Sequence, residues 1–146
     1  MKTRDFENAR WVRDNQKISF RHKSAIDLIA SDSGASAMSV LDLGCGDGLL
    51  LSLLKDRGII GKGLDLSEEG VEKAKSKGID ASVFDFSAKL PFPNGAFDIV
   101  TSLDVLEHLY DPDNLLKEAV RVSKISVIIC VPNFNSLPAR LQVLFG

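Results

Sequence analysis

The sequence predicts an α/β domain built on a mainly parallel sheet with helices on both of its faces. Short apolar runs that fit strands buried on both faces alternate along the chain with longer segments of helical periodicity. The first apolar run, made of Val40, Leu41 and Leu43, leads through a glycine-rich turn directly into an apolar helical segment. A strand, a glycine turn and a helix in this order form a cradle for a nucleotide-containing ligand, because the helix directs free N–H groups at the turn.

Length and composition indicate one ordinary globular domain spanning 1–146. The chain has 146 residues, of which 45% are hydrophobic and 26% are charged. A net charge of -2 gives no reason to expect a nucleic-acid partner. No apolar run is long enough to span a bilayer and no signal peptide is evident, so we expect no membrane partner. Cys45 and Cys130 suit a reducing compartment, and we expect a cytoplasmic protein without a disulfide.

Residues 1–38 are predicted to form an N-terminal helical segment, followed by core βα units at 39–131 and a closing helix at 132–146. Basic side chains outnumber acidic ones up to Lys23, and the apolar positions between 18 and 30 fit a helix. We favour a solvated helix that lies over the edge of the sheet.

The glycines of the turn at 44–48 are not spaced as in a dinucleotide-binding fingerprint. Gly44 and Gly46 let the backbone turn tightly and approach a ligand. A dinucleotide fingerprint places its third glycine where Leu49 stands here. Asp47 is expected to cap the following helix, and its carboxylate would repel a pyrophosphate. A cofactor with a cationic end therefore fits better than a dinucleotide, which makes a dinucleotide-dependent oxidoreductase the disfavoured alternative.

The second strand is predicted at 59–66, with Asp65 at its end. Asp65 lies about 20 residues beyond the glycine turn, where an acidic residue accepts hydrogen bonds from ribose hydroxyls. A residue that caps the next predicted helix, at 67–77, is the alternative. We favour the ribose role on the spacing, and Leu66 is then expected to contact adenine.

The remaining strands are predicted at 79–86, 97–103 and 125–131. Asp111-Pro112 starts a helix between the last two, and a final helical pattern covers 137–145. The inner face of the helix after Pro112 is predicted from its apolar residues, which are Leu115, Leu116, Ala119, Val120 and Val122.

Two runs carry a family resemblance. LDLGCGDG at 41–48 and FDIVTSLDVLEHL at 97–109 resemble motifs of class I S-adenosylmethionine-dependent methyltransferases of the type 11 group. The resemblance implies a Rossmann-like doubly wound sheet of strand order 3-2-1-4-5, whose strands 6 and 7 are apparently missing. It implies S-adenosylmethionine as cofactor, S-adenosylhomocysteine as product and a small-molecule methyl acceptor.

The same resemblance implies the cofactor-binding residues. Asp85 would accept from the exocyclic amine of adenine, and Phe86 would offer its backbone N–H to the ring. A role for Phe86 as core filler stays open. Ser102 and Leu103 would supply backbone contacts to the methionine part. The full set is Asp42, Gly44, Cys45, Gly46, Asp65, Leu66, Asp85, Phe86, Ser102 and Leu103.

The resemblance implies little dedicated catalytic machinery, because the cationic sulfur already makes the methyl group electrophilic and positioning supplies the rest. Asp104 or His108 would polarise or deprotonate the acceptor, although His108 is equally open to a purely structural role. Glu107 with His108 is too sparse for a metal site, so no metal is expected. A basic residue of the N-terminal helix, Arg13 or Arg21, would meet the methionine carboxylate.

The run VPNFNSLPARLQVLFG at 131–146, together with LDLGCGDG, is similar to the methionine-biosynthesis protein MetW family. This implies an alternative function, that of a cofactor-binding partner of a homoserine acyltransferase without methyl transfer of its own. The run DVLEHL departs from the MetW pattern. The strand at 125–131 would be an open sheet edge, and we expect the closing helix or a second copy of the chain, as a homodimer, to cover it.

Overall fold

The computed structural model describes residues 18–31 and 38–133. The closing helix predicted at 137–145 and Arg13 lie outside these residues. Within them, no helix combines the length and apolar character that crossing a bilayer requires.

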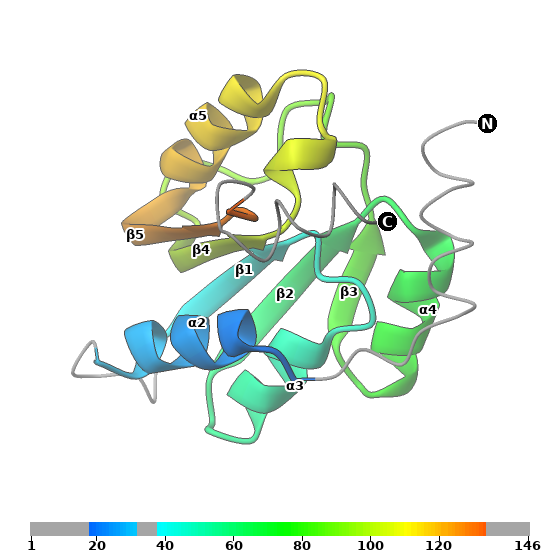
Figure 1. The fold of residues 1–146 in the computed structure, drawn as a ribbon, viewed down its shortest axis with the longest axis vertical. Helices are drawn as coiled ribbons and strands as arrows, with labels where there is room; N and C mark the ends of the chain where they lie inside the picture. The colour runs from blue at the N-terminus through cyan, green and yellow to red at the C-terminus, as the bar shows by residue number, and fades with distance from the viewer. Residues whose placement is uncertain (1–17, 32–37, 134–146) are drawn as a thin grey trace, which may run out of the picture.

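The described residues contain one sheet of five parallel strands. The strands are β1 (Ser39–Leu43), β2 (Ile60–Asp65), β3 (Asp80–Val83), β4 (Phe97–Leu103) and β5 (Ser123–Cys130). They lie side by side in the order β3-β2-β1-β4-β5 (Figure 1). The predicted fold class and strand order are confirmed. Asp42 of β1 stands in register with Gly63 of β2 and Thr101 of β4, so the carboxyl ends of the three central strands come together.

Helices pack on both faces of this sheet. They are α2 (Phe20–Ser31), α3 (Leu49–Lys55), α4 (Glu68–Ser76) and α5 (Pro112–Val122), with a short 3-10 helix, η2 (Leu106–His108), before α5. Residues of α2, α3 and α4 share one buried cluster with alternate strand residues. Residues of α5 share a second cluster with the strand residues of opposite parity. The two-face arrangement explains why the central strands read as continuous apolar runs.

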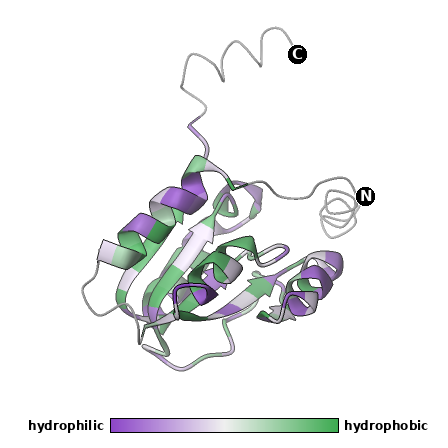
Figure 2. Ribbon diagram, turned by 90° about the horizontal axis from the view of Figure 1, so that it is seen from below, coloured by the Kyte–Doolittle hydropathy of each residue, from purple (hydrophilic) through white to green (hydrophobic). Residues whose placement is uncertain are grey.

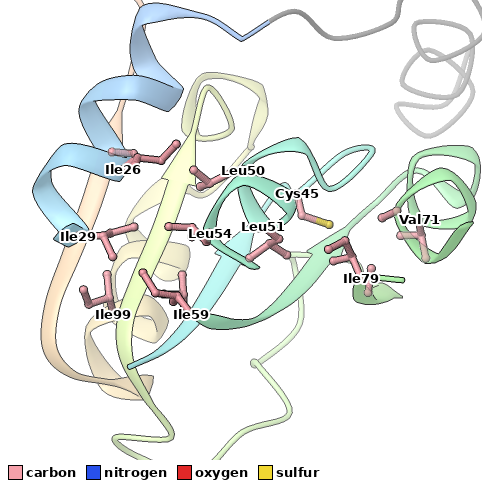
Figure 3. Close-up of a cluster of buried hydrophobic side chains, with 14 residues drawn as sticks. Ile26, Ile29, Cys45, Leu50, Leu51, Leu54, Ile59, Val71, Ile79 and Ile99 are labelled. Atoms are coloured by element: carbon pink, nitrogen blue, oxygen red, sulfur yellow. The ribbon is translucent and has the colours of Figure 1, made fainter. Parts of the chain in front are cut away.

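The first cluster fastens the N-terminal helix to the core. Ile26 and Ile29 of α2 point toward Leu50 and Leu54 of α3 and toward Ile99 of β4 (Figure 3). Ile29, Leu54 and Ile99 are completely buried. The packing places the first turn of α2 near the carboxyl ends of the strands.

Figure 2 shows hydrophobic ribbon along the strands and hydrophilic stretches on the helices that cover them. The second cluster buries Leu41, Leu43 and Val100 under Leu115 and Val122 of α5. Val120, predicted on the inner face of α5, is 65% exposed. It stands one residue after the buried Ala119, which turns it about 100° away around the helix axis. That prediction was wrong.

Two predicted strands differ from those observed. The strand predicted at 79–86 ends at Val83, because Asp85 accepts the Ser87 N–H (2.9 Å) and the chain turns away from the sheet there. The strand predicted as buried at 125–131 is β5. Within the described residues it pairs only with β4, and Ile125 remains 57% exposed. A strand with one described neighbour buries less than the central strands do.

The loop between β3 and β4 is fixed to α5. Arg121 donates to the backbone oxygens of Leu90 (3.1 Å) and Phe92 (2.8 Å), and Glu118 accepts the Leu90 N–H (2.9 Å). Arg121 beside it holds the pKa of Glu118 at about 2, well below its usual value. These contacts hold the segment that follows Asp85 and Phe86 against the domain.

Candidate functional site

The glycine turn follows β1 directly, and backbone hydrogen bonds fasten it to β2. Gly44 and Gly46 have positive φ angles of 82° and 54°, which side chains rarely permit. The N–H groups of Gly44 and Cys45 both donate to the Leu64 oxygen, at 2.7 and 3.0 Å. A Cβ at Gly44 would overlap the Val105 side chain, so the turn lies directly against the segment that follows β4.

Asp65 connects the glycine turn to the end of β2. Its Oδ2 accepts the Gly46 N–H at 2.7 Å, and its Oδ1 accepts the Ser67 N–H at 2.8 Å. Ser67, rather than Asp65, caps α4 by accepting the Gly70 N–H (3.1 Å). The Asp65 carboxylate therefore holds the glycine turn against the end of β2.

Asp42 lies within β1 and is 4% exposed. The Thr101 hydroxyl of β4 donates to Asp42 Oδ1 at 2.7 Å. Burial raises the pKa of Asp42 to about 7; the Thr101 hydrogen bond opposes this rise, and the nearby Asp65 carboxylate adds to it. Asp42 and Asp65 are thus electrostatically coupled beneath the glycine turn.

Asp47 does not cap α3, so that prediction was wrong. The N-cap position is Gly48, which has no side chain to offer. Asp47 instead accepts from Lys77 Nζ at 2.6 Å, and Lys77 also bonds the Asp47 backbone oxygen at 3.0 Å. Lys77 ends α4, and this cation draws the carboxylate away from the helix start. The Oδ1 atom of Asp47 is buried without a hydrogen-bond partner among the described residues.

Cys45 is buried in the turn and is not a reactive thiol. Its side chain lies against Gly63, where a Cβ would overlap the sulfur. Burial raises the pKa of the Cys45 thiol far above its usual range, and the carboxylates of Asp42 and Asp65 raise it further. The small side chain lets the turn pack closely on β2.

The residues that were expected to surround the adenine base differ in their burial. Phe86 is 6% exposed and belongs to the second core cluster, with an edge contact to Phe84 at 5.7 Å between ring centroids. Its side chain is core filler, as the alternative interpretation held. Asp85 is exposed, and its Oδ1 accepts the Ser87 N–H. Leu66 is half-buried directly after Asp65.

The end of β4 carries Ser102 and Leu103, followed by Asp104 with a left-handed φ of 57°. Ser102 is 1% exposed and its Oγ has no hydrogen-bond partner among the described residues. Asp104 Oδ2 forms an ion pair with Arg21 Nη1 of α2. The N-terminal helix is therefore connected to the carboxyl end of β4, close to the glycine turn.

His108 and Glu107 are exposed on η2, and the His108 N–H donates to the Val105 oxygen at 3.0 Å. Asp104, with its left-handed backbone, and the short 3-10 helix η2 lie in the connection between β4 and α5. The described residues contain no group of three or more side chains suited to a metal ion.

Sequence reasoning missed three residues of this site. Thr101, Val105 and Lys77 contact Asp42, Gly44 and Asp47 respectively. Thr101 could have been predicted from the sequence, because aligning the ends of two neighbouring parallel strands puts it opposite Asp42. Lys77 and Val105 left no comparable signal, since each contacts the turn from a separate helix or loop.

Comparisons with known proteins agree with this geometry. The family model of the methionine biosynthesis protein MetW matches residues 24–146. Ajmaline N-methyltransferase of Rauvolfia serpentina is 37% identical over 101 residues, which cover 64% of this chain and 35% of that enzyme. The chain therefore spans about a third of the length of this curated relative, and 54% of a ubiquinone biosynthesis O-methyltransferase of Methylococcus capsulatus.

Solved structures show the same fold. A methyltransferase of Haloferax volcanii, in complex with the Trm112 methyltransferase activator, has a TM-score of 0.69 and 32% identity, and the match covers 84% of this chain and 56% of that one. Magnesium protoporphyrin IX methyltransferase of Synechocystis PCC 6803 has a TM-score of 0.73 at 21% identity, covering 97% and 81% of the two chains, and is similar in fold.

Proposed function

The chain belongs to the methionine biosynthesis protein MetW family, and we propose that it binds S-adenosylmethionine and transfers its methyl group to a small-molecule acceptor. The relative from Rauvolfia serpentina is named as an N-methyltransferase and that from Methylococcus capsulatus as an O-methyltransferase. Both names support methyl transfer to nitrogen or oxygen as the reaction class.

One observation carries the proposal: Asp65 is bonded to the Gly46 N–H at 2.7 Å, which joins the glycine turn to the end of β2. This arrangement puts an acidic residue at the end of β2, the position that binds ribose hydroxyls in nucleotide-binding α/β folds, beside a turn that a ligand can approach closely. Leu49 stands where a dinucleotide fingerprint has its third glycine, which disfavours a ligand that contains a pyrophosphate. An adenosine linked to a cationic sulfur meets both requirements.

The proposed cofactor contacts follow the strand ends. Asp65 binds the ribose hydroxyls, Leu66 contacts adenine, and Asp85 and the Phe86 N–H bind the edge of the base. Ser102 and Leu103 contact the methionine part through their backbone. In support, Ser102 lies opposite Leu43, the residue that leads into the glycine turn.

Bound S-adenosylmethionine would supply an electrophilic methyl group on cationic sulfur, so the chain itself mainly orients the two reactants and excludes water. Asp104 lies beside the turn and is the better-placed of the two acid–base candidates. His108 is exposed on η2 and would act only on an acceptor that extends as far as η2.

A second function is favoured by the family match itself. A member of a methionine biosynthesis family can act beside another enzyme of that pathway, and we propose a homoserine acyltransferase as that partner. In this case the site binds its cofactor without transferring the methyl group. Co-expression with the acyltransferase of the same organism and affinity purification test this. Joint elution supports the partnership, and separate elution on size exclusion contradicts it.

The proposed assembly concerns the edge of the sheet. Within the described residues β5 pairs only with β4, and Ile125 and Val131 are more than half exposed. We expect residues 132–146 or a second copy of the chain to cover this edge.

The thiols of Cys45 and Cys130 are free, which supports a reducing, cytoplasmic location.

A crystal structure with S-adenosylhomocysteine tests the cofactor proposal. We expect ligand density at the carboxyl ends of β1, β2 and β4, with the ribose hydroxyls within hydrogen-bond distance of Asp65. Density at another part of the surface, or a ribose directed away from Asp65, would refute the proposed site.

A further inference from the structure

Helix α2 begins with a capping arrangement that contains a histidine. Ser19 precedes the first helical residue and its backbone oxygen accepts the Lys23 N–H, so Ser19 is the N-cap residue and His22 is the third residue of the helix. The Ser19 N–H donates to His22 Nδ1 at 3.2 Å, and the Ser19 hydroxyl lies 2.8 Å from the same nitrogen. In a capping box a glutamate or glutamine at this position makes the bond to the N-cap N–H. His22 takes the place of that residue.

The bonds between Ser19 and His22 require an unprotonated ring. A backbone N–H can only donate, so Nδ1 of His22 is the acceptor and carries no proton. The Ser19 hydroxyl then also donates to Nδ1. In a protonated imidazole both ring nitrogens are donors, and the Ser19 N–H would face another N–H instead of an acceptor. Uptake of one proton by His22 therefore breaks the cap.

The surroundings of His22 favour the neutral ring. A helix N-terminus carries a partial positive charge, which disfavours a cation in the first turn. The ring is half-buried, and burial and Arg21 lower the pKa of His22, whereas Asp47 raises it. Arg21 is itself paired with Asp104. Asp47 is paired with Lys77 at 2.6 Å, so its attraction for a protonated ring is partly balanced.

Within the described residues, α3 and β4 also pack against α2. The charged residue of α3 is Lys55, which ends that helix. The charged residue of β4 is Asp98, near the start of the strand. Both lie toward the amino ends of the strands, whereas the first turn of α2 lies near the carboxyl ends. Neither therefore faces His22.

The first turn of α2 is held separately from the rest of the helix. Its apolar residue, Phe20, is 83% exposed. Arg21 connects it to Asp104 at the end of β4, which lies against the glycine turn. The later turns are anchored in the core by Ile26 and Ile29. The first turn can therefore unwind while the remainder of α2 stays in place.

We propose that His22 is a pH-dependent cap that keeps the first turn of α2 helical beside the glycine turn at neutral pH and releases it when the ring takes up a proton. The consequence for the cofactor rests on the proposed function, whereas the capping does not. Because the pKa of His22 is lower in the helical turn than in an unwound one, the helical turn is fully favoured above a pH of about 6.5 and loses stability as the pH falls below it. Release exposes the glycine turn to solvent and lowers cofactor affinity.

NMR spectroscopy of the isotope-labelled chain between pH 7.5 and pH 5.0 tests the cap. The Cα chemical shifts of residues 20–23 report whether the turn is helical, and the ring protons report the titration of His22. His22→Gln is the matched variant, because glutamine completes a capping box and does not titrate. His22→Ala has no cap at any pH. Helix α4 is the internal reference, since its N-cap Ser67 accepts the Gly70 N–H at 3.1 Å without a histidine.

We expect the shifts at 20–23 to move toward coil values as the pH falls, with the same midpoint as the His22 ring, below 6.5. The equilibrium constant for forming the turn should drop by about fivefold, as the loss of one N-cap bond predicts. In His22→Gln the turn should stay helical at both pH values, and in His22→Ala it should be frayed at both. The shifts of the first turn of α4 should be the same in all three proteins at each pH.

Calorimetry with S-adenosylhomocysteine at pH 7.5 and pH 5.0 tests the consequence for the site. Other titrating groups, such as Asp42, act alike in the unaltered protein and in His22→Gln. The ratio of the two affinities should therefore be about threefold larger in the unaltered protein than in His22→Gln.

Three results would overturn the proposal. One is a first turn whose shifts change equally with pH in the unaltered protein and in His22→Gln. Another is a His22 ring that titrates at or above 6.5. The third is an equal affinity ratio in both proteins, which would show that the cap does not control the site. If the unaltered protein does not bind S-adenosylhomocysteine at all, the proposed function fails, and the NMR titration still decides whether His22 is the cap.

Discussion

Single residues decide how the glycine turn is held, and Asp65 is the most important of them. Its carboxylate accepts from the Gly46 and Ser67 N–H groups, at 2.7 and 2.8 Å. We expect Asp65→Ala to weaken S-adenosylhomocysteine binding by roughly 1–3 kcal/mol, because ribose hydroxyls and turn amides both lose their acceptor. Calorimetry measures this, with Asp80→Asn as the control at the far end of the sheet. An unchanged affinity would remove Asp65 from the site.

The burial of Asp42 leads to a prediction about how the free energy of unfolding depends on pH. Its folded-state pKa of about 7 is raised from an ordinary value near 4, so the folded chain binds more protons than the unfolded chain between these values. The free energy of unfolding should therefore fall as pH rises through this window, by up to about 1.4 kcal/mol per pH unit. Asp42→Asn keeps an acceptor for Thr101 and removes this dependence.

Urea unfolding at pH 5 and pH 8 measures the effect. The stability of Asp42→Asn relative to the unaltered protein should be greater at pH 8 than at pH 5. Asp27→Asn, at an exposed position of α2, should show no such change. Parallel pH profiles for the unaltered protein and Asp42→Asn would show that the burial of Asp42 does not affect stability.

Among the helices, α4 lies close to the backbone of the glycine turn at Gly70. A Cβ at Gly70 would stand 3.2 Å from the carbonyl carbon and oxygen of Gly46. Gly70→Ala therefore requires the turn to shift, even though alanine favours a helix by about 1 kcal/mol. We expect S-adenosylhomocysteine affinity to fall by about tenfold, about 1.4 kcal/mol, with little loss in the free energy of unfolding.

Calorimetry and urea unfolding on the same variant separate these two effects. Glu72→Ala, at an exposed position of α4, serves as the control for a helix substitution away from the turn. Full affinity in Gly70→Ala would mean that the turn tolerates displacement and that the contact does not set the geometry of the site.

Element boundaries show where the sequence pattern fails. The apolar alternation at 79–86 continues past the end of β3, because Phe86 enters the core from a turn rather than from a strand. Asp47 has the composition of a helix cap, but Lys77, thirty positions away, binds its carboxylate. Local sequence propensity does not reveal a partner so distant in the chain. The helix caps at Ser67 and Asp111, in contrast, bond residues close in sequence and follow the usual preferences for N-cap residues.

On the scale of the whole molecule, the order of the strands and the placement of the glycine turn were predictable. Apolar runs and helical segments alternate regularly, and parallel strands joined by helices allow few topologies. The family motifs supplied the strand order itself. Asp65 was predicted as a ribose-binding residue from its spacing, and the structure places it at the end of β2, bonded to the Gly46 N–H.

What the sequence did not show is the pairing of distant polar groups. The bonds from Thr101 to Asp42 and from Arg21 to Asp104 each join segments that only the folded sheet and α2 bring together. The left-handed backbone at Asp104 was equally hidden, because nothing in DVLEHL requires it. These features depend on tertiary packing, and they are the ones that distinguish this site from a plain strand-to-helix turn.

In the proposed function, the ends of β1, β2 and β4 enclose an adenosine joined to an amino acid. Isothermal titration calorimetry of the purified chain with S-adenosylhomocysteine and with NAD tests it most directly. We expect saturable binding of S-adenosylhomocysteine and none of NAD, because Leu49 stands where a dinucleotide fingerprint has its third glycine. Binding of NAD alone would contradict the account.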